Sequence, residues 1–108
     1  MKRVIVIVAV FTVLAGCANP INRHTAGKYY QAADSAMKSG DWFNARKYFG
    51  RAIQNAEVGS VDPKMMAILW YEYGRSSGVI CDWPETERGL NEAYKLDTET
   101  GGPAYMSL

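Results

Sequence analysis

The sequence predicts an all-α protein in which two helical hairpins stack on one another. First, Gly40-Asp41-Trp42 is flanked on both sides by apolar residues spaced three and four apart, the pattern of two amphipathic helices joined by a turn. Second, the pattern recurs, because Asp82-Trp83 follows Asp41-Trp42 by 41 residues. Repetition at such a period indicates stacked helical units. We therefore expect an α-solenoid of about two hairpins, over residues 25–58 and 62–97.

The first hairpin is expected to contain helices over about 26–39 and 42–57. Gly40 suits the end of the first helix, because glycine adopts the left-handed conformation at little cost. Asp41 can cap the next helix by accepting a free backbone N–H near Asn44. The seam between the helices is expected to consist of small and aromatic residues: Tyr29, Ala32, Ala33, Ala36, Ala45, Tyr48, Phe49, Ala52 and Ile53.

The second hairpin is expected to contain helices over about 63–77 and 83–96. Asp62-Pro63 marks the start of its first helix, with aspartate as the cap and proline where the missing N–H costs nothing. Asp82 and Glu85 have the spacing of a capping box at the start of the last helix.

Cys81 lies in the turn of this hairpin, and we expect it to be a small buried residue. The alternative is a thiol that pairs between chains.

Both copies fit one aromatic and small-residue pattern. The first copy has Tyr29, Ala33, Gly40-Asp41-Trp42, Ala45, Phe49 and Ala52, and the second has Trp70, Tyr73, Gly74, Asp82-Trp83, Leu90, Ala93 and Leu96-Asp97. This pattern resembles the tetratricopeptide repeat family over residues 25–97. It departs from the family at Cys81, where Gly is usual, and at Thr86, where Ala is usual. The period exceeds the usual value of about 34, as in long-helix variants, and Gly78-Val79 before Asp82 resembles the related Sel1-like repeat. The resemblance implies a fold and a binding role, and it names no partner.

The N-terminus has the layout of a targeting segment. Lys2 and Arg3 precede an apolar run over 4–14 that is interrupted only by Thr12. A run of 11 residues suits a signal peptide and is too short to cross a hydrocarbon core of about 30 Å. The following Leu14-Ala15-Gly16-Cys17 resembles the lipobox of bacterial lipoproteins.

That resemblance implies that residues 1–16 are removed, that the Cys17 thiol takes a diacylglyceryl group, and that the new N-terminus is acylated. Several acyl chains, at about 0.8 kcal/mol per buried CH₂, would anchor the protein permanently. The alternatives are an ordinary secretory signal and a short uncleaved anchor. Ala18, where Asp would retain a lipoprotein at the inner membrane, resembles the outer-membrane sorting pattern of Gram-negative bacteria. We therefore expect a cell-envelope location at the periplasmic face of the outer membrane.

Residues 17–24 are expected to form an acylated N-terminus and a short non-helical tether, because Pro20 and two Asn residues disfavour helix. At the other end, residues 101–108 repeat the layout that begins the third helix, since Pro103 follows Pro63 by 40 residues. They are expected to be either the start of an incomplete third repeat or a C-terminal cap.

The composition and the motifs do not favour an enzyme. A net charge of +1 does not indicate the strongly basic character that is typical of nucleic-acid-binding proteins. The sequence carries no phosphate-binding glycine loop and no nucleophile motif, so we expect no catalytic residues and no cofactor. His24 is the only histidine, and we expect a solvated residue there and no metal site.

What remains is a binding surface. In tetratricopeptide arrays the first helix of each hairpin lines a concave groove. Carried over to this sequence, the resemblance places seven residues there: Tyr30, Asp34, Met37, Lys38, Ile68, Tyr71 and Arg75. The expected function is a membrane-anchored scaffold that binds a protein or peptide partner in envelope or secretion-system assembly. The alternatives are a structural subunit that completes its fold in a larger complex, and a fragment of a longer lipoprotein.

Overall fold

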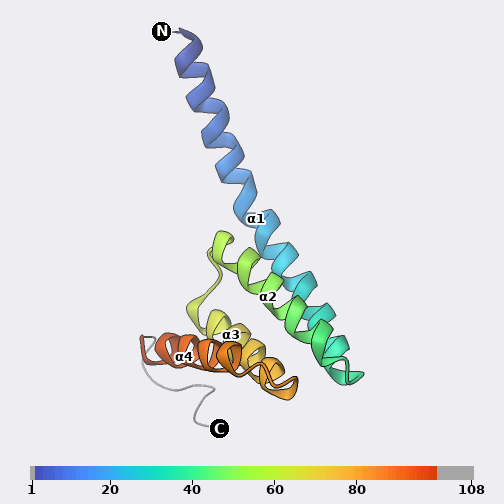
Figure 1. The fold of residues 1–108 in the computed structure, drawn as a ribbon. Helices are drawn as coiled ribbons and strands as arrows, with labels where there is room; N and C mark the ends of the chain where they lie inside the picture. Colours follow the sequence, from blue (N-terminus) through green and yellow to red (C-terminus); the bar gives the residue numbers. More distant parts are fainter. Residues whose placement is uncertain (1, 100–108) are drawn as a thin grey trace.

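The computed structural model describes the backbone of residues 2–99 and the side chains of residues 19–99. The described residues form four helices (Figure 1): α1 (Lys2–Lys38), α2 (Trp42–Val58), α3 (Pro63–Val79) and α4 (Trp83–Glu99). No strand occurs among the described residues, so the predicted all-α class is confirmed. The Cys17 side chain and residues 101–108, both subjects of sequence predictions, lie outside this description.

The turn between α1 and α2 has the predicted chemistry. Gly40 has a φ of +80°, the left-handed conformation that glycine adopts most easily. The Asp41 carboxylate accepts the backbone N–H of Asn44 at 3.3 Å, as a helix cap does. The chain therefore reverses its direction within three residues, and α2 packs along the C-terminal part of α1 (Figure 1).

The connection from α2 to α3 also forms as predicted. The Asp62 side chain caps α3 by accepting the backbone N–H of Lys64 at 2.7 Å, and Pro63 is the first helical residue. The second hairpin, α3 with α4, then packs against the first through α3 and α2.

The turn between α3 and α4 differs from two expectations. Cys81 is exposed, so the expected burial was wrong. Its φ of +64° shows that it takes the left-handed position that Gly40 takes in the first turn, which points its side chain outward. The expected capping box is replaced by other contacts: the Asp82 carboxylate accepts from Arg46, and Glu85 accepts from the Tyr73 hydroxyl at 2.8 Å.

The N-terminal helix is longer than expected. Residues 18–24, expected to be a non-helical tether, are part of α1, and Pro20 lies inside the helix. Tertiary contacts explain this difference. Arg23 Nε donates to the Gly59 carbonyl at 2.6 Å, and Ala26 is buried in the core, so this part of α1 packs on the end of α2. The earlier part of α1 projects away from the other helices (Figure 1).

Small residues bring the helices of each hairpin close together. In the first hairpin Ala33, Ala45 and Ala52 are fully buried, as the predicted seam requires. In the second, α3 crosses α4 at Gly74 and Gly89. A Cβ at Gly89 would lie 2.7 Å from the Gly74 Cα, closer than real side chains approach. The core continues between the hairpins through Phe49 of α2 and Leu69 and Trp70 of α3.

Candidate binding surface

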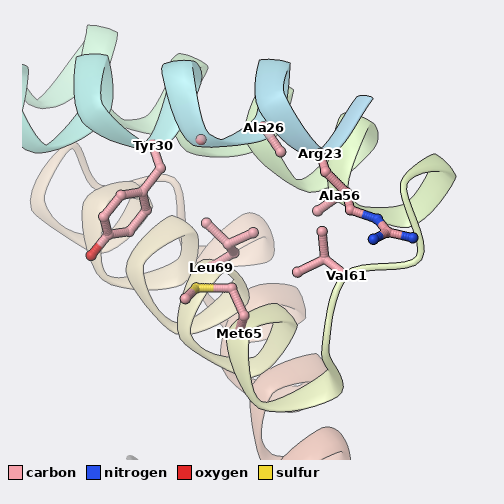
Figure 2. A pocket seen from close by; sticks show the side chains of 8 residues that line it. Arg23, Ala26, Tyr30, Ala56, Val61, Met65 and Leu69 are labelled. Atoms are coloured by element: carbon pink, nitrogen blue, oxygen red, sulfur yellow. The ribbon is translucent and has the colours of Figure 1, made fainter. Parts of the chain in front are cut away.

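An apolar cleft of about 170 Å³ lies between α1 and α3, the first helices of the two hairpins (Figure 2). Its walls come from three elements, α1, the end of α2 with the connection after it, and α3. The lining residues are Arg23, Ala26, Gly27, Tyr30, Ala56, Val61, Met65 and Leu69. A cavity of about 150 Å³ with apolar walls takes a benzene ring, so this cleft has room for one bulky side chain.

The α1 wall combines small residues with one fixed aromatic ring. Ala26 and Gly27 have little or no side chain, and a Cβ added at Gly27 would meet no atom within 4 Å. Tyr30 is 36% exposed, and its ring meets the Phe49 ring edge-on at a centroid distance of 6.0 Å. The buried Phe49 therefore fixes the tyrosine at the side of the cleft (Figure 2).

The opposite wall is formed by α3 and the chain that leads into it. Met65 remains 43% exposed, whereas Leu69, one turn further along α3, is buried. Val61 from the connection and Ala56 from α2 complete this side (Figure 2). Methionine is flexible and polarisable, so Met65 can adapt to different occupants.

The N-terminal end of the cleft is held by Arg23. Its Nε donates to the Gly59 carbonyl, which ties α1 to the end of α2. A second, more polar hollow of about 290 Å³ adjoins the cleft, since Arg23 and Gly27 line both. Its other lining residues are His24, Lys28 and Gln31.

The seven residues predicted for the groove lie on α1 and α3, but the structure gives them different surroundings. Only Tyr30 lines the cleft. Asp34 and Lys38 form an ion pair one turn apart at 2.8 Å, and the hydrogen bond to Asp34 raises the pKa of the exposed Lys38. Ile68 and Tyr71 are half-buried on α3.

Arg75 and Met37 join the two hairpins at the other end of these helices. The Arg75 guanidinium donates to the Met37 sulfur at 2.8 Å and pairs with Glu72 at 3.0 Å. It also lies 5.8 Å from the centre of the Trp42 ring. Because three groups hold it, we interpret Arg75 as a residue that fixes the hairpins relative to each other.

Most of the cleft residues were not predicted. Met65 and Leu69 are spaced by four on α3, which the apolar periodicity could have indicated. The contributions of Ala56, Val61 and Arg23 depend on how α1, α2 and α3 meet in space, and no local pattern carries that information.

On the other side of α2, a wider polar groove runs between α2 and α4. Tyr73 donates its hydroxyl to Glu85 at 2.8 Å, and Arg88 donates to the same carboxylate at 2.8 Å. These bonds lower the pKa of Glu85, with the Tyr73 bond as the larger cause. Desolvation, followed by the bond to Glu85, raises the pKa of Tyr73. This network fixes α3 against α4.

Comparison with protein-family models, with curated proteins and with solved structures finds no significant match to this chain. Within the described part of the chain, no helix combines the length and the apolar character needed to cross a membrane. Nor do the side chains described there include a group of three or more that could hold a metal ion.

Proposed function

We propose that the chain is a lipid-anchored helical-repeat protein of the tetratricopeptide type that holds a protein partner at the cell envelope. Cys17 would carry the acyl chains, and the cleft between α1 and α3 would take the partner. The observation that carries this proposal is the cleft itself, an apolar hollow with two partly exposed large side chains, Tyr30 and Met65, at its sides. Aromatic anchors that fill such pockets supply most of the energy of protein interfaces.

The continuous α1 helix supports the proposed anchor. In a chain that begins at Cys17, Pro20 is the fourth residue of α1. The first four N–H groups of a helix have no acceptor within it, so a proline there removes no hydrogen bond. Gly27 follows Cys17 by ten residues, about 15 Å along the helix at about 1.5 Å per residue. The cleft would therefore lie close to the membrane surface, connected to the acylated Cys17 by the rigid α1 helix.

One observation favours the second candidate, a structural subunit that completes its fold in a complex. Trp42 lies beneath Arg75 of the next hairpin, but its counterpart in the last hairpin, Trp83, is 63% exposed. Likewise Ile53 is 4% exposed, whereas its counterpart Tyr94 is 62% exposed. The outer face of the second hairpin thus presents aromatic residues where the first hairpin is covered by α3.

The anchor is tested by intact-mass measurement of the mature chain from its native membranes. Acyl groups on an N-terminal Cys17 are expected, whereas an unmodified Cys17 or a retained 1–16 segment would refute the anchor.

Two paired variants separate the functions. The scaffold predicts that Tyr30→Ala with Met65→Ala abolishes partner recovery in pull-downs while the helical content stays the same. It predicts little effect from Trp83→Ala with Tyr94→Ala. The structural-subunit function predicts the reverse, namely loss of assembly or solubility only when the outer aromatic residues are removed.

A further inference from the structure

The residues around the apolar cleft carry charge of one sign. The adjoining hollow is lined by two cationic side chains, Arg23 and Lys28, and among the described residues that line either hollow none has a carboxylate. Arg23 gives one N–H to the Gly59 carbonyl, a neutral acceptor, so this contact leaves the charge uncompensated. The α1 side of the cleft is therefore positively charged.

The nearby acidic residues do not neutralise this charge. The Asp62 carboxylate caps α3 by accepting the backbone N–H of Lys64, and the cationic side chain of Lys64 follows it by only two residues. Glu57 lines a separate hollow that it shares with Trp70 and Arg88. Asp34 is paired with Lys38 further along α1.

We propose that the cleft and the adjoining hollow together bind an acidic peptide segment of a partner protein. One bulky apolar side chain of the segment enters the cleft, and carboxylates next to it lie over Arg23 and Lys28. The inference rests on the proposed scaffold function and adds the chemistry of its partner.

The size of the cleft favours a peptide over a lipid acyl chain. Its volume of about 170 Å³ is close to that of a cavity that holds a single benzene ring, about 150 Å³. One phenylalanine or leucine side chain fits this space, whereas an acyl chain of membrane length does not. The charges would steer the partner and set its register, and the apolar anchor would supply most of the affinity.

The test uses the full chain in nanodiscs of neutral phosphatidylcholine and fluorescent peptides as probes. The first peptide has one phenylalanine between glutamates in a glycine-serine background. The second replaces the phenylalanine with alanine, and the third replaces the glutamates with lysines. Anisotropy is expected to show roughly thirtyfold weaker binding of the alanine peptide, the effect of losing an anchor residue. The lysine peptide is expected to bind more weakly than the first peptide, and this difference should decrease as salt is added.

Two protein variants locate the binding site. Gly27→Leu places a side chain at the junction of the two hollows, where its Cβ meets no atom within 4 Å, so it should block binding without unfolding the chain. Lys28→Glu reverses an exposed charge and is expected to weaken binding roughly fivefold, with reduced salt dependence. The matched control, Lys47→Glu on the outer side of α2, is expected to leave binding unchanged.

Three results would overturn the inference. One is equal binding of the phenylalanine and alanine peptides, and another is equal loss of binding in Lys28→Glu and Lys47→Glu. The third is a lipid occupant. In nanodiscs that contain phosphatidylglycerol, a photo-crosslinker at Met65 would then attach to lipid, and Gly27→Leu would abolish that adduct. Crosslinking of Met65 to a protein in native membranes does not depend on the partner's charge. If the peptide test fails but Met65 still crosslinks to a protein in native membranes, the acidic partner is rejected and the proposed scaffold function is retained.

Discussion

The close crossing of α3 and α4 makes Gly89 the most sensitive position for a single methyl group. A Cβ added there would lie 2.7 Å from the Cα and N of Gly74 and 2.9 Å from the Trp70 carbonyl oxygen. All three are backbone atoms, which cannot move aside as the end of a flexible side chain can. Gly89→Ala therefore forces the two helices apart.

The expected cost can be worked from two opposing terms. Overpacking a close contact costs about 1–3 kcal/mol, and backbone neighbours place this site at the upper end. Replacing glycine by alanine inside a helix stabilises the helix by about 1 kcal/mol. The net loss in the free energy of unfolding is therefore about 2 kcal/mol. For a domain of this size, each kcal/mol lowers Tm by roughly 4–8 °C.

Urea denaturation of the full chain in mild detergent, followed by far-UV circular dichroism, measures this loss. The matched control is Gly27→Ala in α1, where a Cβ meets no atom within 4 Å. It should gain about 1 kcal/mol from helix propensity alone. The same chemical change should thus have opposite signs at the two positions. If Gly89→Ala were neutral, or as stabilising as Gly27→Ala, the described crossing of α3 and α4 would be wrong.

Three further variants test the turns and the polar contacts. Cys81→Gly should stabilise the fold by about 0.5–1 kcal/mol in thermal melts, because Cys81 has a φ of +64°; a loss of stability would contradict the left-handed turn. The hydrogen bond from the Tyr73 hydroxyl is the main cause that lowers the pKa of Glu85 in the folded protein. The ionised Glu85 therefore stabilises the fold fully above its ordinary pKa of 4.5, and this stabilisation is lost as the pH falls through the lower pKa of the folded state. Glu85→Gln should remove up to ~1 kcal/mol at neutral pH and flatten the acid side of the stability profile, and an unchanged profile would refute this contribution. A double-mutant cycle of Arg46→Ala and Asp82→Ala should give a coupling of about 0.5–1 kcal/mol that decreases with salt, because this partly buried pair joins α2 to the α3–α4 turn; zero coupling would show that the pair does not stabilise the packing.

Local chemistry accounts for the parts of the fold that the sequence predicted. Gly40 and Asp41 act through their own backbone and side-chain preferences, and Asp62-Pro63 does the same at the start of α3. These features need no knowledge of distant residues, so the expected end of α1 and the expected boundaries of α2, α3 and α4 agree with the structure within a few residues.

The errors arise where distant contacts decide the outcome. Pro20 argues locally against helix, but the bond from Arg23 to Gly59 and the burial of Ala26 hold residues 23–26 on the end of α2. Cys81 was expected to be buried because it is small, and its left-handed conformation exposes it.

Of the seven residues predicted for a groove, one lines the cleft. Tyr30 was expected on the binding surface from the family resemblance, and it does line the cleft. The other walls require the relative placement of α1 and α3, to which Ala56 and Val61 contribute from the elements between them. Periodicity identifies the face that a helix buries, and it does not reveal where two packed helices leave space.

Site-specific photo-crosslinking in native membranes is the sharpest test of whether the cleft between α1 and α3 binds a partner. With p-benzoyl-phenylalanine in place of Met65, at the cleft, we expect a discrete adduct with one partner protein in the membrane fraction. The same reporter in place of Lys47, on the outer side of α2, should not form that adduct. The absence of a protein adduct at Met65, or the same adducts from both positions, would contradict a partner-binding cleft between α1 and α3.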